Sequence, residues 1–103
     1  MIRIHVLDGC DKCNNFKQAL DNLKIKYKVV SCEKDPNECD KIELLTETET
    51  YPMAILDGEE IAILYITNKF EDLGKKIKKG SNIALFPFYS IDNMLLYIKN
   101  RLN

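Results

Sequence analysis

The first third of the chain constrains the fold most strongly, because two short β-branched runs flank one amphipathic stretch. Residues 2–7 and 26–31 have the composition of strands, whereas residues 14–24 carry apolar side chains at the i, i+3, i+4, i+7 spacing of a helix. The apolar positions of this stretch are Phe16, Ala19, Leu20 and Leu23. Two strands joined by a helix pair in parallel through a right-handed crossover. The sequence therefore predicts that the chain begins with a β-α-β unit.

A hairpin is predicted in the middle of the chain, where residues 53–56 and 61–66 form apolar runs on either side of Asp57-Gly58. An Asp-Gly pair favours a type I′ turn, because both central residues of that turn need positive φ. We therefore expect these two runs to be antiparallel neighbours in the sheet.

Three further helices are predicted. Residues 36–46 follow Asp35, which can act as the N-cap, and Glu38 lies where a capping box places its acid. Residues 68–80 form the second of these helices, and Ser90 caps the third, which extends to the end of the chain. These signals complete the order β-α-β-α-β-β-α with an extra C-terminal helix.

The chain of 103 residues suits a single α/β domain over residues 1–103. We expect a mixed, roughly four-stranded sheet with helices on its faces. A short apolar run at residues 83–86, which Pro87 is expected to stop, can add an edge strand.

Composition and charge exclude several classes of function. The formal net charge of −1 lacks the strong positive field of a dedicated nucleic-acid binder. No apolar run approaches the ~20 residues that span a bilayer, and the first residues are too polar for a secretory signal. We therefore expect a cytoplasmic monomer that binds neither nucleic acid nor membrane.

The motif that carries chemistry is Cys10-Asp11-Lys12-Cys13, between the first strand and the first helix. Gly9 lets the chain turn, so that Cys10 lies at the helix N-terminus, where backbone N–H groups and the helix dipole favour a thiolate. Lys12 adds a positive charge, which Asp11 opposes. Cys13 lies one helical turn further on and can form a disulfide with Cys10. Cys10 is therefore the predicted attacking thiol and Cys13 the resolving thiol.

Thr50-Tyr51-Pro52 directly precedes the third strand. A proline has no N–H for the strand ladder, so it marks the strand's beginning, and a cis bond there would place a tight turn opposite the two cysteines. The order of strand, Cys-x-x-Cys, helix, strand, helix and Thr-x-Pro before a hairpin resembles the thioredoxin fold. The chain is most similar to the glutaredoxin and glutaredoxin-like redoxin branch of that fold, over roughly residues 1–75.

The resemblance implies a thiol-disulfide oxidoreductase that transfers electrons to protein or small-molecule disulfides through Cys10 and Cys13. It implies that Pro52 is cis and packs against these cysteines, and that Tyr51, with Lys12, helps to bind a peptide or glutathione. Glutathione or a flavoprotein reductase would supply the electrons, and neither an organic cofactor nor a metal is required. The acidic turn of the family corresponds to Glu71-Asp72 or, if residues 59–80 hold an insertion, to residues 90–93.

Two other functions remain open. Cys32 and Cys39 form a Cys-x6-Cys pair, and eighteen residues separate Cys13 from Cys32. The four cysteines could therefore bind zinc or an iron–sulfur cluster. A redoxin domain without catalysis could instead bind partners through the groove at Tyr51 and Pro52. His5, the single histidine, is expected to be a packed or surface residue.

Overall fold

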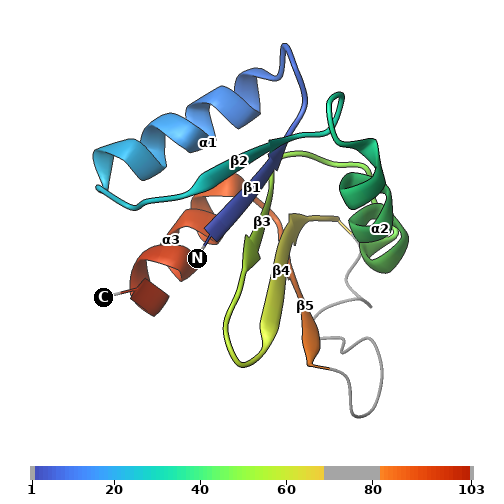
Figure 1. Ribbon diagram of the computed structural model, residues 1–103. Coiled ribbons are helices and arrows are strands. Elements are labelled where there is room, and N and C mark those ends of the chain that lie inside the picture. Colours follow the sequence, from blue (N-terminus) through green and yellow to red (C-terminus); the bar gives the residue numbers. More distant parts are fainter. Residues whose placement is uncertain (1, 69–81, 103) are drawn as a thin grey trace.

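The computed structural model describes residues 2–68 and 82–102. Five strands and three helices occur in this part of the chain (Figure 1). In chain order they are β1 (Ile2–Val6), α1 (Asp11–Asn22), β2 (Lys28–Ser31), α2 (Pro36–Thr46), β3 (Met53–Leu56), β4 (Ile61–Ile66), β5 (Ile83–Phe88) and α3 (Ile91–Leu102). All predicted strands are present, while the helix predicted over residues 68–80 falls outside the described residues apart from Asn68.

The strands form one mixed sheet in the order β2-β1-β3-β4-β5. β1 and β2 are parallel, as the crossover helix predicts, and β3 is antiparallel to both β1 and β4. The sheet has five strands rather than four, because β5 pairs in parallel with β4 and continues through Pro87 to Phe88. Proline is tolerated at this position because β5 is an edge strand, which is hydrogen-bonded to a neighbour on one side only.

Helices cover both faces of the sheet, with α1 and α3 on one side and α2 on the other (Figure 1). The alternation of side chains along β1 assigns its residues to these faces. Arg3 and His5 point toward α2, where they contact Glu38 and Cys39. Neighbouring positions such as Ile4 therefore point to the opposite face, which α1 and α3 cover.

The core lies at the centre of the sheet. All four residues of β3 and the central four of β4 are buried. Phe16 and Leu20 of α1 and Met94 and Ile98 of α3 have no exposed surface, as their helical spacing predicts. Each such side chain contributes roughly 1.5–3 kcal/mol by leaving water. This packing holds the start of α1 firmly against the sheet, and the cysteine motif lies at that start.

Two local predictions were wrong. The β3–β4 connection is a four-residue loop, residues 57–60, and Gly58 does not have the positive φ of a type I′ turn. Asp35 is the N-cap residue of α2 but its side chain makes no capping hydrogen bond. The carboxylate of Glu38 pairs with Arg3 of β1 rather than with the helix backbone. A tertiary ion pair thus replaces the predicted capping box.

Candidate functional site

Cys10 lies at the junction between β1 and α1. Val6 ends the strand, and Gly9 has a φ of +71°, a left-handed conformation that glycine adopts without a Cβ clash. Cys10 is the N-cap residue of α1 in an extended conformation, and the helix begins at Asp11. The predicted position of Cys10 at a helix N-terminus is therefore present in the structure.

The two cysteines of the motif form a disulfide across the first turn of α1, with Cα atoms 5.2 Å apart. The backbone N–H of Cys13 donates a hydrogen bond to Cys10 Sγ over 3.0 Å. Cys13 is only 1% exposed, whereas Cys10 is half-buried at the rim of the core. The two cysteines thus differ in their surroundings: Cys10 is half-buried and its sulfur accepts an N–H, whereas Cys13 is buried.

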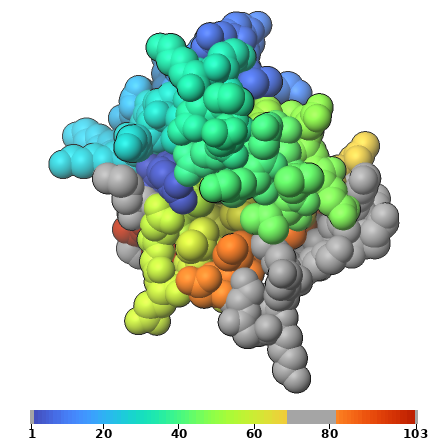
Figure 2. Space-filling view, turned by 45° about the vertical axis from the view of Figure 1, so that its right-hand side comes forward, coloured from blue at the N-terminus to red at the C-terminus, as the bar shows by residue number. Residues whose placement is uncertain are grey.

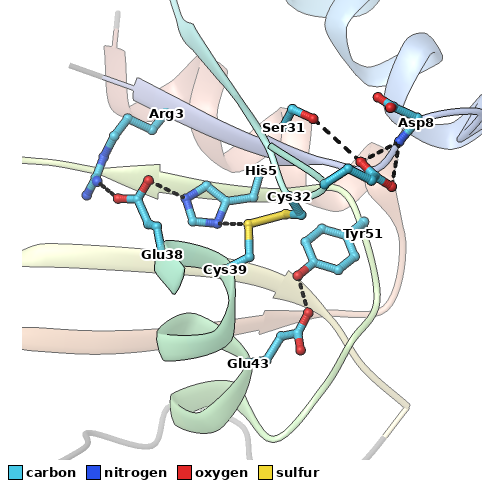
Figure 3. Close-up of a disulfide and its surroundings, with 10 residues drawn as sticks. Arg3, His5, Asp8, Ser31, Cys32, Glu38, Cys39, Glu43 and Tyr51 are labelled. Atoms are coloured by element: carbon cyan, nitrogen blue, oxygen red, sulfur yellow. Dashed lines mark hydrogen bonds and ion pairs between the residues drawn. A yellow bond between two sulfur atoms is a disulfide. The ribbon is translucent and has the colours of Figure 1, made fainter. Parts of the chain in front are cut away.

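Tyr51-Pro52 has a cis peptide bond, as expected from the Thr-x-Pro motif. Both residues are buried just before β3. The Tyr51 hydroxyl donates a hydrogen bond to the Glu43 carboxylate of α2 (Figure 3). Burial, then the hydrogen bond and charge of Glu43, raise the pKa of Tyr51 well above its usual value near 10. Tyr51 is therefore a neutral hydrogen-bond donor that connects the segment before β3 to α2.

A hollow of about 290 Å³ lies between the start of α1, the segment before β3 and the start of α3. Its lining residues are Lys12, Thr50, Tyr51, Ile66, Tyr89, Ser90, Ile91 and Asp92. The structure therefore brings two of the predicted binding residues, Lys12 and Tyr51, to one hollow. Glu71-Asp72, one of the two candidates for an acidic turn, lies outside the described residues, and the other candidate borders this hollow.

Ser90 caps α3 as predicted, since its Oγ accepts a hydrogen bond from the Asn93 N–H over 3.2 Å. The N-terminus of α3 therefore faces the hollow, with exposed Asp92 in its first turn. A second helix N-terminus beside that of α1 makes this corner of the molecule favourable for an anionic group.

The second pair of cysteines is at a different place in the fold. Cys32 follows β2, Cys39 lies in α2, and the two form a disulfide. Cys32 is 8% exposed and Cys39 is 1% exposed. Figure 2 shows the teal and green residues of β2, the following loop and α2 as a continuous cover on this face of the molecule. Both cysteines of this pair are therefore buried, whereas Cys10 is half-buried.

His5 lies directly against the second disulfide (Figure 3). It is 0% exposed, and its Nδ1 is 3.6 Å from Cys39 Sγ. On the other side of the ring, Nε2 is 3.8 Å from the Glu38 carboxylate, which also pairs with Arg3. Burial lowers the pKa of His5 despite the opposing effect of Glu38, so the imidazole is neutral at pH 7. The sequence predicted a packed or surface histidine, and the structure shows the packed one.

A backbone contact joins the two cysteine regions. The Asp8 N–H donates to both carboxylate oxygens of Glu33 over 3.1 Å. Asp8 precedes the Cys-x-x-Cys motif by two residues, and Glu33 directly follows Cys32. Sequence reasoning missed Glu33 because no spacing rule connects a loop after β2 to a loop after β1, although parallel strands end at the same edge.

The structure does not bring the four cysteines together. Their sulfur atoms form two separate pairs, Cys10–Cys13 and Cys32–Cys39. Within residues 2–68 and 82–102, the only group of three or more potential metal ligands consists of His5, Cys32 and Cys39. The four-cysteine metal site that the sequence left open is therefore not formed in this structure.

Comparison with known proteins gives one family. The family model described as glutaredoxin matches residues 2–61, which is more than half of the chain. No curated protein and no solved structure shows significant similarity. In the described part of the chain, no helix has the length and apolar character needed to cross a membrane. The matched segment contains the Cys-x-x-Cys motif, the cis-proline and the first three strands of a thioredoxin-like fold, and on this evidence the chain belongs to the glutaredoxin family.

Proposed function

We propose that the protein is a thiol-disulfide oxidoreductase in which Cys10 is the nucleophile and Cys13 the resolving thiol. The observation that carries the proposal is the environment of Cys10. Its sulfur lies at the N-terminus of α1 and accepts the Cys13 N–H, and a hydrogen bond from an amide is stronger to a thiolate than to a thiol. Family membership supports the same chemistry, since glutaredoxins generally act on glutathione and disulfide substrates.

The reaction requires no atoms beyond the two thiols and a substrate disulfide. The Cys10 thiolate attacks one substrate sulfur, a mixed disulfide forms, and the other substrate sulfur leaves as a thiolate that takes a proton. The Cys13 thiolate then attacks Cys10 Sγ and releases the second substrate thiol. The protein is left with the Cys10–Cys13 disulfide, which is the state in the structure. Two electrons and two protons from glutathione or a flavoprotein reductase restore the dithiol.

The hollow at the start of α1 is the proposed binding site for the disulfide substrate. Lys12 contributes a positive charge at one wall, and the start of α3 contributes free backbone N–H groups and the hydroxyl of Ser90 at another. Asp92, on the same wall, can accept a hydrogen bond from a substrate ammonium group and form an ion pair with it. A small molecule that carries both carboxylates and an ammonium group, such as glutathione, has matching chemistry. The backbone of Tyr51 can pair with an extended peptide by β-augmentation.

The proposal includes a cytoplasmic location and a monomeric protein without a resident organic cofactor. The physical basis for the cytoplasmic location is the need for a thiol pool that returns Cys10–Cys13 to the dithiol after each cycle. Cell fractionation and a sedimentation measurement test these two points independently of the reaction.

A direct test uses the reduction of a small mixed disulfide of glutathione, with glutathione as reductant. Wild type is expected to turn over, and Lys12→Ala is expected to raise KM several-fold, because the positive wall of the hollow is lost. Lys26→Ala is a matched control, since Lys26 is an exposed lysine outside the residues that line this hollow. The proposal fails if the wild-type protein, with Cys10 and Cys13 reduced, shows no turnover with any small or protein disulfide.

A further inference from the structure

The buried Cys32–Cys39 pair has no role in the proposed reaction, yet a buried histidine, His5, lies against it and a carboxylate, Glu38, lies on the far side of the histidine ring. We propose that, once this disulfide is reduced, Cys32, Cys39 and His5 form a binding site for a zinc ion. The inference goes beyond the oxidoreductase activity and uses none of the residues of the Cys10 site.

The three donor atoms lie close enough together for one ion to contact all of them. His5 Nδ1, Cys32 Sγ and Cys39 Sγ all lie within 4.8 Å of one another. A tetrahedral zinc bound at about 2.0 Å by nitrogen and about 2.3 Å by sulfur holds these two donors roughly 3.5 Å apart. The observed separation of His5 Nδ1 and Cys39 Sγ is 3.6 Å. Reduction breaks the S–S bond and lets the two sulfur atoms move apart around an ion.

The far side of the imidazole ring supports the same assignment. Nε2 of His5 is buried and has no hydrogen-bond partner among the described residues. The Glu38 carboxylate lies 3.8 Å from Nε2, and Arg3 holds that carboxylate through an ion pair (Figure 3). When a histidine binds a metal through one nitrogen, its other N–H commonly points to a carboxylate, which fixes the tautomer. Here Nδ1 faces the sulfur and Nε2 faces the carboxylate, as that arrangement requires.

Charge and donor type select the metal. Two thiolates and a neutral imidazole are soft donors that favour zinc over magnesium or calcium. The two negative charges cancel those of Zn²⁺, so the buried site as a whole is neutral and avoids the cost of a buried net charge. Three protein ligands leave one position for a water molecule, as in other three-ligand zinc sites. Cys32 is the most exposed of the three ligands, at 8%.

The site exists in one redox state only. A phosphine or dithiol reductant supplies two electrons, and with two protons the disulfide becomes two thiols. Zinc binding then displaces these two protons and leaves two thiolates on the ion. A small-molecule disulfide reverses the change: it takes two electrons from the two thiolates and, with two protons, becomes two thiols, while the Cys32–Cys39 bond forms and the metal is released. The Cys32–Cys39 pair therefore alternates between a disulfide and a zinc dithiolate.

The experiment uses the Cys10→Ser, Cys13→Ser protein, so that the exposed pair cannot bind metal. The full-length chain is reduced with a phosphine, desalted without oxygen and titrated with Zn²⁺ against a chromophoric chelator. One equivalent of zinc is expected per reduced chain and none per oxidised chain. Co²⁺ in place of Zn²⁺ is expected to give the intense near-ultraviolet absorption of cobalt bound to thiolate.

Three variants on this background test the ligands. Cys39→Ser is expected to abolish stoichiometric binding, and His5→Gln is expected to weaken it strongly. Glu38→Gln, which changes a half-buried side chain and spares the core, is expected to weaken binding 10–100-fold, as is typical of carboxylates that orient a metal-binding histidine. Glu59→Gln is the matched control, because Glu59 is exposed in the β3–β4 loop, and it is expected to bind as the background does.

The proposal is overturned if the reduced background protein binds no zinc, or if Cys39→Ser still binds one equivalent. It is also overturned if folded His5→Gln, or Glu38→Gln where His5→Gln does not fold, binds zinc as tightly as the background. Circular dichroism establishes which variants are folded. The oxidoreductase proposal is judged separately, from turnover by the protein with Cys10 and Cys13 intact.

Discussion

The two cysteine pairs of this protein use the same bond in opposite surroundings. Cys10–Cys13 spans one turn at a helix N-terminus, where one sulfur is accessible and receives a backbone N–H. Cys32–Cys39 connects the end of β2 to α2, and both residues are buried. We therefore expect the reactivity of each cysteine to depend on its exposure and on neighbouring N–H groups, since both pairs consist of the same chemical groups.

The comparison predicts that only the exposed pair carries the activity, and this is the largest expected effect. Cys10→Ser is expected to reduce disulfide-reductase turnover by at least about a hundredfold, because the nucleophile is lost. The Cys32→Ala, Cys39→Ala protein is expected to keep most of its turnover. Steady-state assays of the three proteins test this, and loss of turnover in the double-alanine protein would contradict the division of roles.

The buried pair is expected to matter for stability instead. Replacing Cys32 and Cys39 by alanine in the oxidised protein is expected to lower the free energy of unfolding by about 2–3 kcal/mol, because the unfolded chain is no longer closed into a loop. Urea unfolding of wild type and the double variant measures this difference. The Cys10–Cys13 disulfide closes a shorter loop, so its removal in Cys10→Ala, Cys13→Ala is expected to cost less. Equal or reversed losses would break the comparison.

Alkylation sharpens the comparison within the reduced protein. Iodoacetamide near neutral pH is expected to modify Cys10 at least about tenfold faster than Cys13, Cys32 or Cys39, because Cys10 combines access with thiolate stabilisation. Mass spectrometry of peptides after short exposure gives the order of labelling. Earlier modification of Cys13 or Cys32 would show that the N-terminus of α1 does not determine reactivity.

The smallest expected effect concerns Tyr51, whose hydroxyl links the two regions through Glu43 of α2. Its pKa is raised in the folded protein, so above pH 10 the unfolded chain loses a proton that the folded chain retains. Stability therefore falls as pH rises through this range, and Tyr51→Phe is expected to make the decline shallower. The charges of Asp40 and Glu49, the other acids near Tyr51, act on the pKa of Tyr51 in the same direction as Glu43. Denaturant unfolding at several pH values from 9 to 11 measures the two slopes, and parallel slopes would contradict the coupling.

Much of the active-site region could be predicted from local sequence. The β-branched run before Gly9, the helical spacing after Cys13 and the position of Pro52 are local signals, and the strand, helix and cis bond are all present. The hairpin strands were also predicted, but the turn type was wrong because a four-residue loop joins them. A dipeptide preference is weak compared with the register that the buried residues of β3 and β4 impose.

The β-α-β unit and the placement of Cys10 at a helix start could be predicted from the sequence, because each depends on residues close together in the chain. The family could be predicted from the order of such local motifs along the chain. The parallel pairing of β5 with β4, the approach of α3 to the start of α1 and the contacts of His5 with Cys39 and Glu38 depend on tertiary packing. These features join segments more than twenty residues apart. Their partners are chosen by packing across the sheet, which leaves no periodic or local signal in the sequence.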